Sequence, residues 1–225
     1  MNKTKIEWTD ASWNPVTGCL HGCRYCYARK IATRFAGKAA FPNGFKPTFH
    51  PERLAQPVKE RKPKKIFVCS MADLFGEWVP VYWIDQVIDV VRRCPQHTFQ
   101  FLTKNPARLG AVDWPENCWV GVTAETQELA ESRVDALLRC NARIKFLSAE
   151  PIQERIESEL LSRLDWLIVG WVSGTKESKR PDYEKIDSIL DAARKYGKPV
   201  FEKPNTLRPG PKEFPNFEKP LSLLF

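Results

Sequence analysis

The chain has 225 residues, of which 43% are hydrophobic and 28% are charged, the balance of an ordinary globular protein. Its net charge of +8 permits a polyanionic partner such as a nucleic acid but does not require one. No apolar run is long enough to span a bilayer and the chain starts with polar residues, so we expect no membrane segment, no secretory signal and a cytoplasmic location.

Short β-rich runs alternate with helical patterns along the chain. The predicted strands cover residues 5–9, 65–70, 98–103, 118–123, 143–148, 166–170 and 199–202. The predicted helices cover residues 28–36, 81–93, 127–139 and 183–196. This alternation favours a parallel sheet with right-handed crossovers. We predict an α/β fold, a single-domain partial (β/α)6–7 barrel, because a full barrel takes about 250 residues. An open doubly wound sheet is the alternative.

Two proline-containing segments interrupt the alternation. The first, residues 39–63, has no clear period and is interpreted as an insertion that lies over the barrel. The second, residues 204–225, is interpreted as an extended tail packed on the barrel or capping its open edge. Residues 1–203 would then form the barrel itself.

Three of the seven cysteines are clustered after the first predicted strand. Cys19, Cys23 and Cys26 are separated by three and then two residues, with Tyr25 just before the last. Without a secretory signal, clustered cysteines indicate metal ligands rather than disulfides. Three thiolates this close can hold an iron–sulfur cube and leave its fourth iron without a protein ligand. The other cysteines are scattered, which is typical of small buried residues: Cys69, Cys94, Cys118 and Cys140.

A structural zinc site is the alternative for this cluster. Zinc sites usually combine two separated pairs of ligands, so a fourth ligand would have to come from His21 or from a distant cysteine. We interpret His21 as an ordinary loop residue and favour the iron–sulfur cluster.

Polar and ionisable side chains follow the ends of the predicted strands. In parallel α/β folds, functional residues gather at the carboxyl ends of the strands. Together with the cysteines they predict a pocket at this edge. The residues are Asp10, Asn14, Ser70, Asp73, Lys104, Asn105, Thr123, Glu125, Ser148, Glu150, Ser173, Glu202 and Lys203.

The cysteine spacing, the aromatic before the last cysteine and the position between a strand and a helix form the signature of the radical S-adenosylmethionine (radical SAM) superfamily, which the chain resembles. Further phrases are similar to a family of short phage and bacterial radical-SAM-like proteins, generally labelled phage proteins of unknown function. That family distantly resembles the spore photoproduct lyase branch of the superfamily. The phrases are residues 6–10, 13–19, 102–106, 147–151 and 165–170. The resemblance implies a partial barrel of the radical SAM type.

The resemblance also implies a cofactor arrangement. Cys19, Cys23 and Cys26 would ligate a [4Fe-4S] cluster, whose open iron would bind the amine and carboxylate of S-adenosylmethionine. Tyr25 would lie against the adenine.

The resemblance implies further cofactor contacts at the strand ends. Relatives often bind the methionyl amine with a Gly-Gly-Glu sequence that is missing here, so Ser70 or Asp73 would take that role. Thr123, Glu125 and Glu150 would contact the ribose or the carboxylate side of the cofactor.

The implied activity is one-electron cleavage of S-adenosylmethionine to a 5′-deoxyadenosyl radical, which abstracts hydrogen from a substrate. A flavodoxin or ferredoxin would supply the electron. The positive charge and the phage-like family favour a nucleic acid or nucleotide as substrate, and a peptide or partner protein is the alternative. A non-enzymatic, metal-containing nucleic-acid-binding module with tryptophan stacking platforms is also conceivable, but it leaves the three thiolates unexplained.

One phrase departs from the narrower family. Relatives commonly have Gly-Gly-Glu-Ser-Gly after the sixth strand, whereas residues 170–174 read Gly-Trp-Val-Ser-Gly. Val172 replaces an acidic residue and Trp171 adds bulk, so we expect the specificity to differ.

Overall fold

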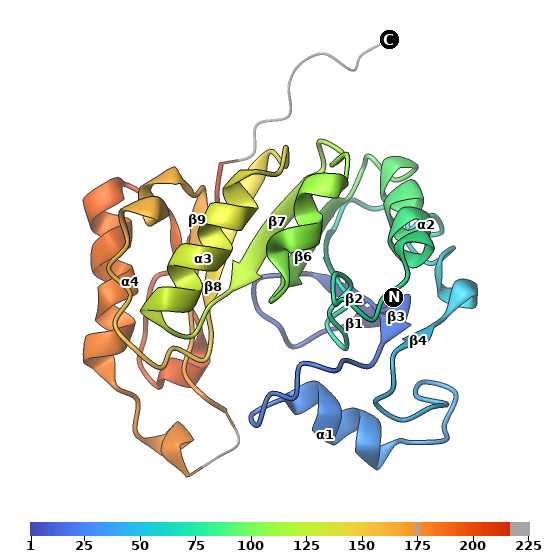
Figure 1. The fold of residues 1–225 in the computed structure, drawn as a ribbon, viewed down its shortest axis with the longest axis horizontal. Coiled ribbons are helices and arrows are strands. Elements are labelled where there is room, and N and C mark those ends of the chain that lie inside the picture. The colour runs from blue at the N-terminus through green and yellow to red at the C-terminus, as the bar shows by residue number, and fades with distance from the viewer. Residues whose placement is uncertain (174–175, 217–225) are drawn as a thin grey trace.

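The computed structural model describes residues 1–173 and 176–216 (Figure 1). Its main sheet has eight strands in the order β1-β2-β5-β6-β7-β8-β9-β10. The first, β1 (Asn2–Lys3), is antiparallel to its neighbour, and the other seven run parallel. They are β2 (Ala11–Trp13), β5 (Lys65–Val68), β6 (Thr98–Thr103), β7 (Cys118–Thr123), β8 (Ile144–Ala149), β9 (Trp166–Val169) and β10 (Val200–Glu202). Within the described residues β1 and β10 do not pair with each other, so the sheet is a partial barrel open on one side.

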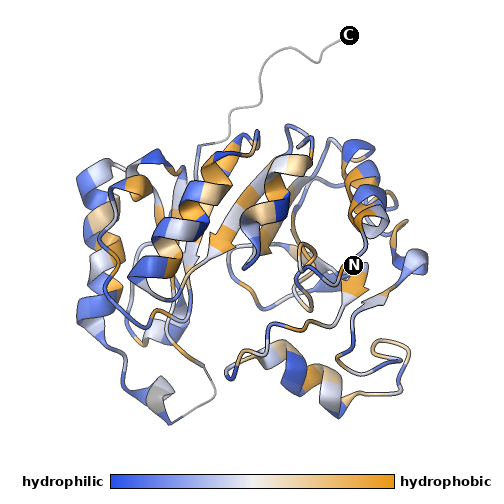
Figure 2. Ribbon diagram, viewed as in Figure 1, coloured by the Kyte–Doolittle hydropathy of each residue, from blue (hydrophilic) through white to orange (hydrophobic). Residues whose placement is uncertain are grey.

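In the described residues four α-helices accompany the sheet: α1 (Tyr27–Arg34), α2 (Val81–Arg92), α3 (Gln127–Leu138) and α4 (Tyr183–Tyr196). Helices α2, α3 and α4 pack on the outer face, and the strands are more hydrophobic than the exposed helix faces (Figure 2). The connections within the described part of the chain contain five short 3-10 helices: η1 (Pro51–Arg53), η2 (Pro106–Ala111), η3 (Glu159–Arg163), η4 (Glu177–Lys179) and η5 (Pro204–Thr206). None of the described helices has the length and hydrophobicity that a membrane crossing requires.

The helix ends follow local capping rules. The Thr126 hydroxyl accepts a hydrogen bond from the Leu129 amide at the start of α3, and Asp182 does the same for Lys185 in α4. Helix α4 ends at Gly197, whose φ of 61° is the left-handed conformation that favours glycine. The ends of this helix and the bounds of β6 and β7 agree with the sequence prediction.

The predicted first strand is wrong. Residues 5–9 form no strand, and the strand that opens the barrel is β2, two residues later. The Thr9 amide donates to Ile6 O in a turn, and the Trp8 side chain enters the barrel. The pattern that suggested a strand therefore reflects the burial of the Trp8 side chain in the core. In the described structure, no strand pairs with the backbone of residues 5–9.

Strand residues alternate between two hydrophobic cores, because successive side chains point to opposite faces of a sheet. One core lies between the sheet and the helices. The other fills the amino end of the barrel, and its buried members are Trp8, Phe67, Trp119, Ile144, Phe146, Trp166, Ile168 and Phe201. Gly121 faces this second core, where a Cβ atom would lie 2.5 Å from the Phe146 ring. The base of the barrel is thus a packed plug, and a ligand must approach from the carboxyl end.

Two further segments pack against the barrel. Within the predicted insertion of residues 39–63, β4 (Thr48–Phe49) pairs antiparallel with β3 (Val16–Thr17). Near the end of the described chain, the Phe214 ring lies 5.4 Å from that of Trp166, and Lys65 Nζ lies 3.7 Å from the Phe214 ring centroid. Residues 217–225 of the predicted tail lie outside the described residues, and the predicted domain limits stay a prediction.

Candidate functional site

The cysteine loop, residues 18–26, lies at the carboxyl end of the sheet. Gly18 has a φ of 87°, and a Cβ atom there would lie 2.2 Å from Lys46 O, so this position requires glycine. The Gly18 amide donates to Met71 O at 2.9 Å, and the Cys19 amide donates to Phe45 O at 3.3 Å. The loop is therefore held between the segment that follows β5 and the insertion.

All three clustered cysteines are free thiols at partly exposed positions. Cys26 is the N-cap of α1, and its Sγ accepts a hydrogen bond from the Arg29 amide at 3.3 Å. Burial raises the pKa of the Cys19 thiol to about 11, although the His21 amide opposes the shift. A metal that binds the thiolate would offset this cost.

The three free thiols of the cysteine loop are the type of ligand that iron–sulfur clusters use. Among the described residues, no three His, Cys, Asp or Glu side chains lie close enough together to share one metal ion. Tetrahedral zinc needs four such ligands around one centre. A cube binds each thiolate to a different iron, so its three cysteines stand farther apart and its fourth iron stays open.

Asp73 links the cysteine loop to the strand ends. Its carboxylate accepts hydrogen bonds from Thr103 Oγ1 at 2.7 Å, from the Phe75 amide at 3.0 Å and from the Lys104 amide at 2.9 Å. His21 Nε2 lies 2.7 Å from its second oxygen. These four partners occupy the acceptor sites of a carboxylate, so the contacts of Asp73 are those of a residue that positions the loop. His21 is thus more than the ordinary loop residue that the sequence suggests, because it supplies the link.

Ser70 forms hydrogen bonds with two residues, one before the cysteine loop and one at the start of α1. Its hydroxyl donates to Asn14 Oδ1 at 3.2 Å, and its carbonyl accepts a hydrogen bond from Tyr27 Oη at 2.6 Å. Cys69, just before it, is buried at a φ of 58°, which turns its side chain into the outer core instead of the barrel interior. A left-handed conformation at a non-glycine residue is strained, and such strain gathers at functional sites.

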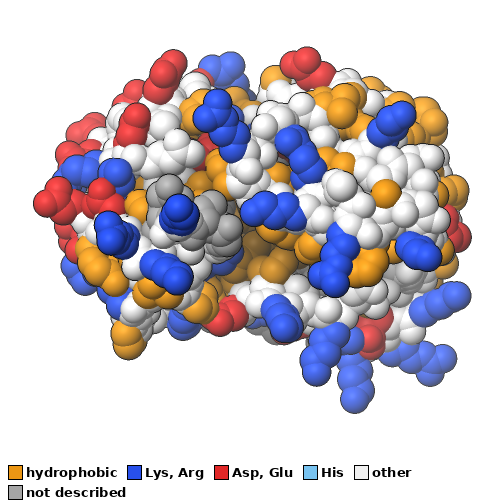
Figure 3. All heavy atoms as spheres, turned by 90° about the horizontal axis from the view of Figure 1, so that it is seen from below, with side chains coloured by type: hydrophobic (Ala, Val, Ile, Leu, Met, Phe, Trp, Pro, Cys, Tyr) orange, Lys and Arg blue, Asp and Glu red, His pale blue; other side chains and the backbone are white. Residues whose placement is uncertain are grey.

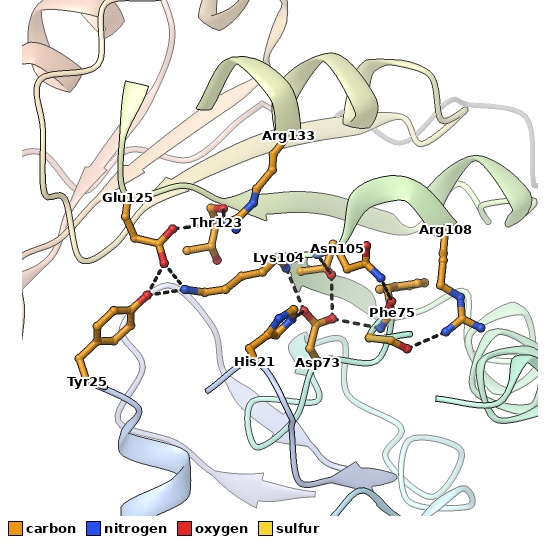
Figure 4. A network of polar contacts seen from close by, with 12 residues as sticks. His21, Tyr25, Asp73, Phe75, Lys104, Asn105, Arg108, Thr123, Glu125 and Arg133 are labelled. Carbon is orange, nitrogen blue, oxygen red and sulfur yellow. Dashed lines mark hydrogen bonds and ion pairs between the residues drawn. The ribbon is translucent and has the colours of Figure 1, made fainter. Parts of the chain in front are cut away.

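A second network surrounds Glu125 (Figure 4). Tyr25 Oη and Lys104 Nζ both donate to Glu125 Oε1, and Lys104 Nζ also donates to Tyr25 Oη. Arg133 Nη1 lies 3.2 Å from the other carboxylate oxygen and donates to Thr123 O. Burial by itself raises the pKa of Glu125, but the hydrogen bonds from Lys104 and Tyr25 and the charges of Lys104 and Arg133 bring it below its ordinary value. Glu125 is therefore a buried, ionised carboxylate.

Glu150 belongs to a separate group at the ends of β8, β9 and β10. It accepts hydrogen bonds from Lys203 Nζ and from Asn205 Nδ2, the latter at 3.2 Å. A Cβ atom on Gly170 would lie 3.1 Å from Glu150 Oε1, so the backbone passes close to the carboxylate. The Trp171 amide donates to Asn205 Oδ1 at 3.1 Å. This group ties the loop after β9 to the segment after β10.

The structure brings some of the predicted site residues together and separates others. Tyr25, Thr123 and Glu125 meet in one network, and Asp73 is joined to it through the backbone of Lys104. Glu150 lies with Lys203 instead. The departure predicted at residues 170–174 can be followed as far as Ser173, because Gly174 lies outside the described residues.

Four residues of these networks were not among the predicted cofactor and metal ligands: His21, Lys104, Arg133 and Asn205. Lys104 lies at a strand end within one of the family-like phrases, which is a usable signal. Arg133 lies within α3 and no local pattern distinguishes it from a surface arginine.

The face seen from the side of α1 is basic and hollowed (Figure 3). Figure 3 views the molecule from below, from the side on which α1 lies in Figure 1. Lysine and arginine side chains are spread over this face, and hydrophobic side chains form the floor of a hollow near its middle. The hollow offers a ligand a route to the carboxyl end of the barrel.

Known proteins resemble the chain in sequence and in fold. The profile of the family described as "Protein of unknown function (DUF5131)" matches residues 3–205. No curated protein matches the chain by sequence.

Solved structures of spore photoproduct lyase share the fold. A cysteine-to-serine mutant superposes with a TM-score of 0.62 at 12% identity, covering 89% of this chain and 78% of that chain. A double mutant with bound AdoMet and dinucleoside spore photoproduct gives 0.63 at 12% identity with the same coverage. A complex with dinucleoside spore photoproduct gives 0.58, also at 12% identity and with the same coverage. The predicted partial-barrel fold is thereby confirmed.

Proposed function

The chain belongs to the family described as "Protein of unknown function (DUF5131)", and we propose that it is a radical SAM enzyme. Cys19, Cys23 and Cys26 would hold a [4Fe-4S] cluster, with S-adenosylmethionine as the second cofactor. One observation carries the proposal: three free thiols stand at the carboxyl end of a parallel partial barrel, beside a network of buried charges. A non-enzymatic metal-binding module would not require a network of buried charges beside its thiols.

The cluster and S-adenosylmethionine, when bound, supply one-electron cleavage of the C5′–S bond and a 5′-deoxyadenosyl radical for hydrogen abstraction. The chain's own residues would orient and shield the cofactor. Glu125 is an ionised carboxylate beside the loop, and its charge holds the Lys104 ammonium and the Arg133 guanidinium in place. The aromatic plug at the base of the barrel excludes water from below.

Lys104 and Tyr25 would position the cofactor. The Lys104 ammonium lies 4.9 Å from the Tyr25 ring centroid and donates to its hydroxyl. It thus offers a positive charge to a carboxylate of the ligand, while Tyr25 offers an aromatic face to a base. Because Glu125 orients both side chains, the three residues would act as one unit.

The proposed substrate is a nucleic acid or nucleotide. The net charge of +8 and the basic face around the hollow favour a polyanion. Three of the structural neighbours contain dinucleoside spore photoproduct, which supports the same class of substrate for this chain. A peptide or partner protein is the competing substrate.

The test of the enzyme is anaerobic reconstitution with iron and sulfide, followed by dithionite and S-adenosylmethionine. We expect iron, a broad visible absorbance and 5′-deoxyadenosine, detected by mass spectrometry. Cys23→Ala should abolish all three, because two thiolates hold a cluster poorly. Cys140→Ala, which changes a buried cysteine outside the loop, is the matched control. Stoichiometric zinc without visible absorbance would refute the proposal.

The test of the substrate uses deuterium. Cleavage is run with deuterated DNA or RNA in one reaction and with deuterated cell protein in another. We expect deuterium in 5′-deoxyadenosine only from the nucleic acid. Transfer from protein alone would replace the nucleic-acid substrate with a peptide.

A further inference from the structure

A long segment around the cysteine loop has no acidic residue. Between Asp10 and Glu52 the sequence contains lysines and arginines but neither aspartate nor glutamate. No ion pair of the described residues involves any of these cations. Their charge is therefore not neutralised within the described part of the chain. They are Arg24, Arg29, Lys30, Arg34, Lys38 and Lys46.

Helix α1 exposes its large apolar residues and buries its small ones. Tyr27, Ile31 and Phe35 are spaced four residues apart along one face and are 52%, 40% and 46% exposed. The buried face holds only Ala28 and Ala32. A surface helix normally has the reverse arrangement. Exposed apolar side chains that adjoin one another indicate an interaction site.

This surface directly adjoins the proposed cluster ligands. Leu20, 58% exposed, follows Cys19, and Tyr27 follows Cys26, which is the N-cap of α1. Tyr27 Oη also donates to Ser70 O at 2.6 Å, which fixes the first turn of α1 against the strand ends. A molecule that covers α1 would therefore sit beside the cysteine loop.

Resting on the proposed function, we propose that α1 and the cysteine loop form the docking surface for a small acidic electron-carrier protein with a flavin or an iron–sulfur centre. On docking, the carrier would lose one electron and the cluster of this chain would gain it, with no bond made or broken. The uncompensated cations complement an acidic partner and would accelerate its association. Interfaces of this kind are small, so one helix and one loop suffice.

The composition of the surface favours a protein over a nucleic acid. An apolar centre with a polar, arginine-containing rim is the usual anatomy of a protein–protein interface. Nucleic acids are bound mainly through cations on phosphates and aromatic rings on bases, and aliphatic side chains serve there chiefly as wedges between base steps. Leu20 and Ile31 are aliphatic and exposed among the cations, and an apolar protein surface would bury both.

The experiment measures binding rather than turnover. Fluorescently labelled flavodoxin and ferredoxin are titrated with the reconstituted full chain at low and at physiological ionic strength. We expect weaker binding at the higher salt, because exposed charges are screened. Lys30→Glu combined with Arg34→Glu should raise the Kd at least about tenfold. Ile31→Ser should raise it about fivefold without changing the salt dependence.

A matched pair of substitutions controls for charge. Arg61→Glu combined with Lys62→Glu makes the same change at exposed positions near the amino end of β5, away from α1. We expect this variant to bind the carrier as the parent does. Iron content and circular dichroism would verify that every variant is folded and loaded.

The outcomes separate this inference from the proposed function. Binding that the α1 reversals leave unchanged, or no binding of either carrier, refutes the docking surface. So does a double reversal that weakens only the binding of a DNA oligonucleotide, which would make α1 a nucleic-acid surface. A parent that fails to cleave S-adenosylmethionine with dithionite, a reductant that needs no docking, refutes the proposed function and this inference with it.

Discussion

At its amino end the barrel is filled by eight apolar side chains, six of them aromatic, whereas its carboxyl end carries carboxylates, a lysine, an arginine and three thiols. The amino end is held by burial and ring packing, which depend on volume. The carboxyl end is held by hydrogen bonds between charged groups, which depend on direction and on every partner being present. Substitutions at the first end should therefore change stability, and those at the second should change ligand binding more.

The largest stability effect is expected at the centre of the aromatic plug. Trp166 is fully buried, and its ring contacts those of Trp119 at 5.6 Å and Phe146 at 5.3 Å. Trp166→Ala should lower the free energy of unfolding by about 3–5 kcal/mol, measured by chemical denaturation. Tyr82→Ala, at an exposed aromatic on α2, should change it by no more than about 0.5 kcal/mol. Equal losses of unfolding free energy in the two variants would show that the plug contributes no more to stability than an exposed aromatic ring.

A glycine gives a sharper test of packing in the same region. Gly121→Ala would place a methyl carbon 2.5 Å from the Phe146 ring, closer than van der Waals contact allows, and should cost about 2 kcal/mol of unfolding free energy. Gly110→Ala is the control, because nothing lies within 4 Å of a Cβ atom there. Adding Phe146→Leu to Gly121→Ala should recover part of the loss. A double variant less stable than the sum of the two single changes would contradict the packing explanation.

At the carboxyl end, Glu125→Gln should have a smaller effect on stability and a larger one on binding. The amide keeps the shape but removes the charge that Lys104 and Arg133 share. We expect a loss of about 1.5 kcal/mol in unfolding free energy. The affinity for S-adenosylmethionine, measured by calorimetry on the reconstituted protein, should fall about tenfold or more. Trp166→Ala should leave the affinity of its folded fraction for S-adenosylmethionine nearly unchanged. A loss of affinity in Trp166→Ala but not in Glu125→Gln would contradict the proposed difference between the two ends of the barrel.

The smallest global effect is expected for the link between the cysteine loop and Asp73. His21→Ala removes one contact of the Asp73 carboxylate and leaves the other three, so unfolding free energy should fall by about 1 kcal/mol or less. Amide hydrogen exchange in residues 18–26 should nevertheless become faster, because the loop loses its tie to the strand ends. His21→Asn would test whether a shorter polar side chain restores protection. Unchanged exchange in His21→Ala would assign His21 no role in holding the loop.

The sequence by itself determined most of the secondary structure and the proposed metal ligands. Buried runs such as residues 98–103 and 118–123 carry the period of a strand within themselves, and the bounds of β6 and β7 follow from them. The spacing of Cys19, Cys23 and Cys26 is equally local. The first strand was misplaced because the alternation around Trp8 reflects a side chain entering the barrel rather than a backbone pairing with a neighbour.

Only the tertiary structure decided which side chains meet. Tyr25 and Glu125 are 100 positions apart, and His21 and Asp73 are 52 apart, yet each pair shares a hydrogen bond. Strand and helix periods arise from consecutive residues, so a short window contains them. A contact between strand ends depends instead on the order of the strands in the sheet and on the direction in which the backbone leaves each strand. No short window of the sequence contains both partners. For that reason the thiols could be found from their spacing, and Lys104 from its place at a strand end, whereas the meeting of Lys104 and Arg133 at Glu125 could not be predicted.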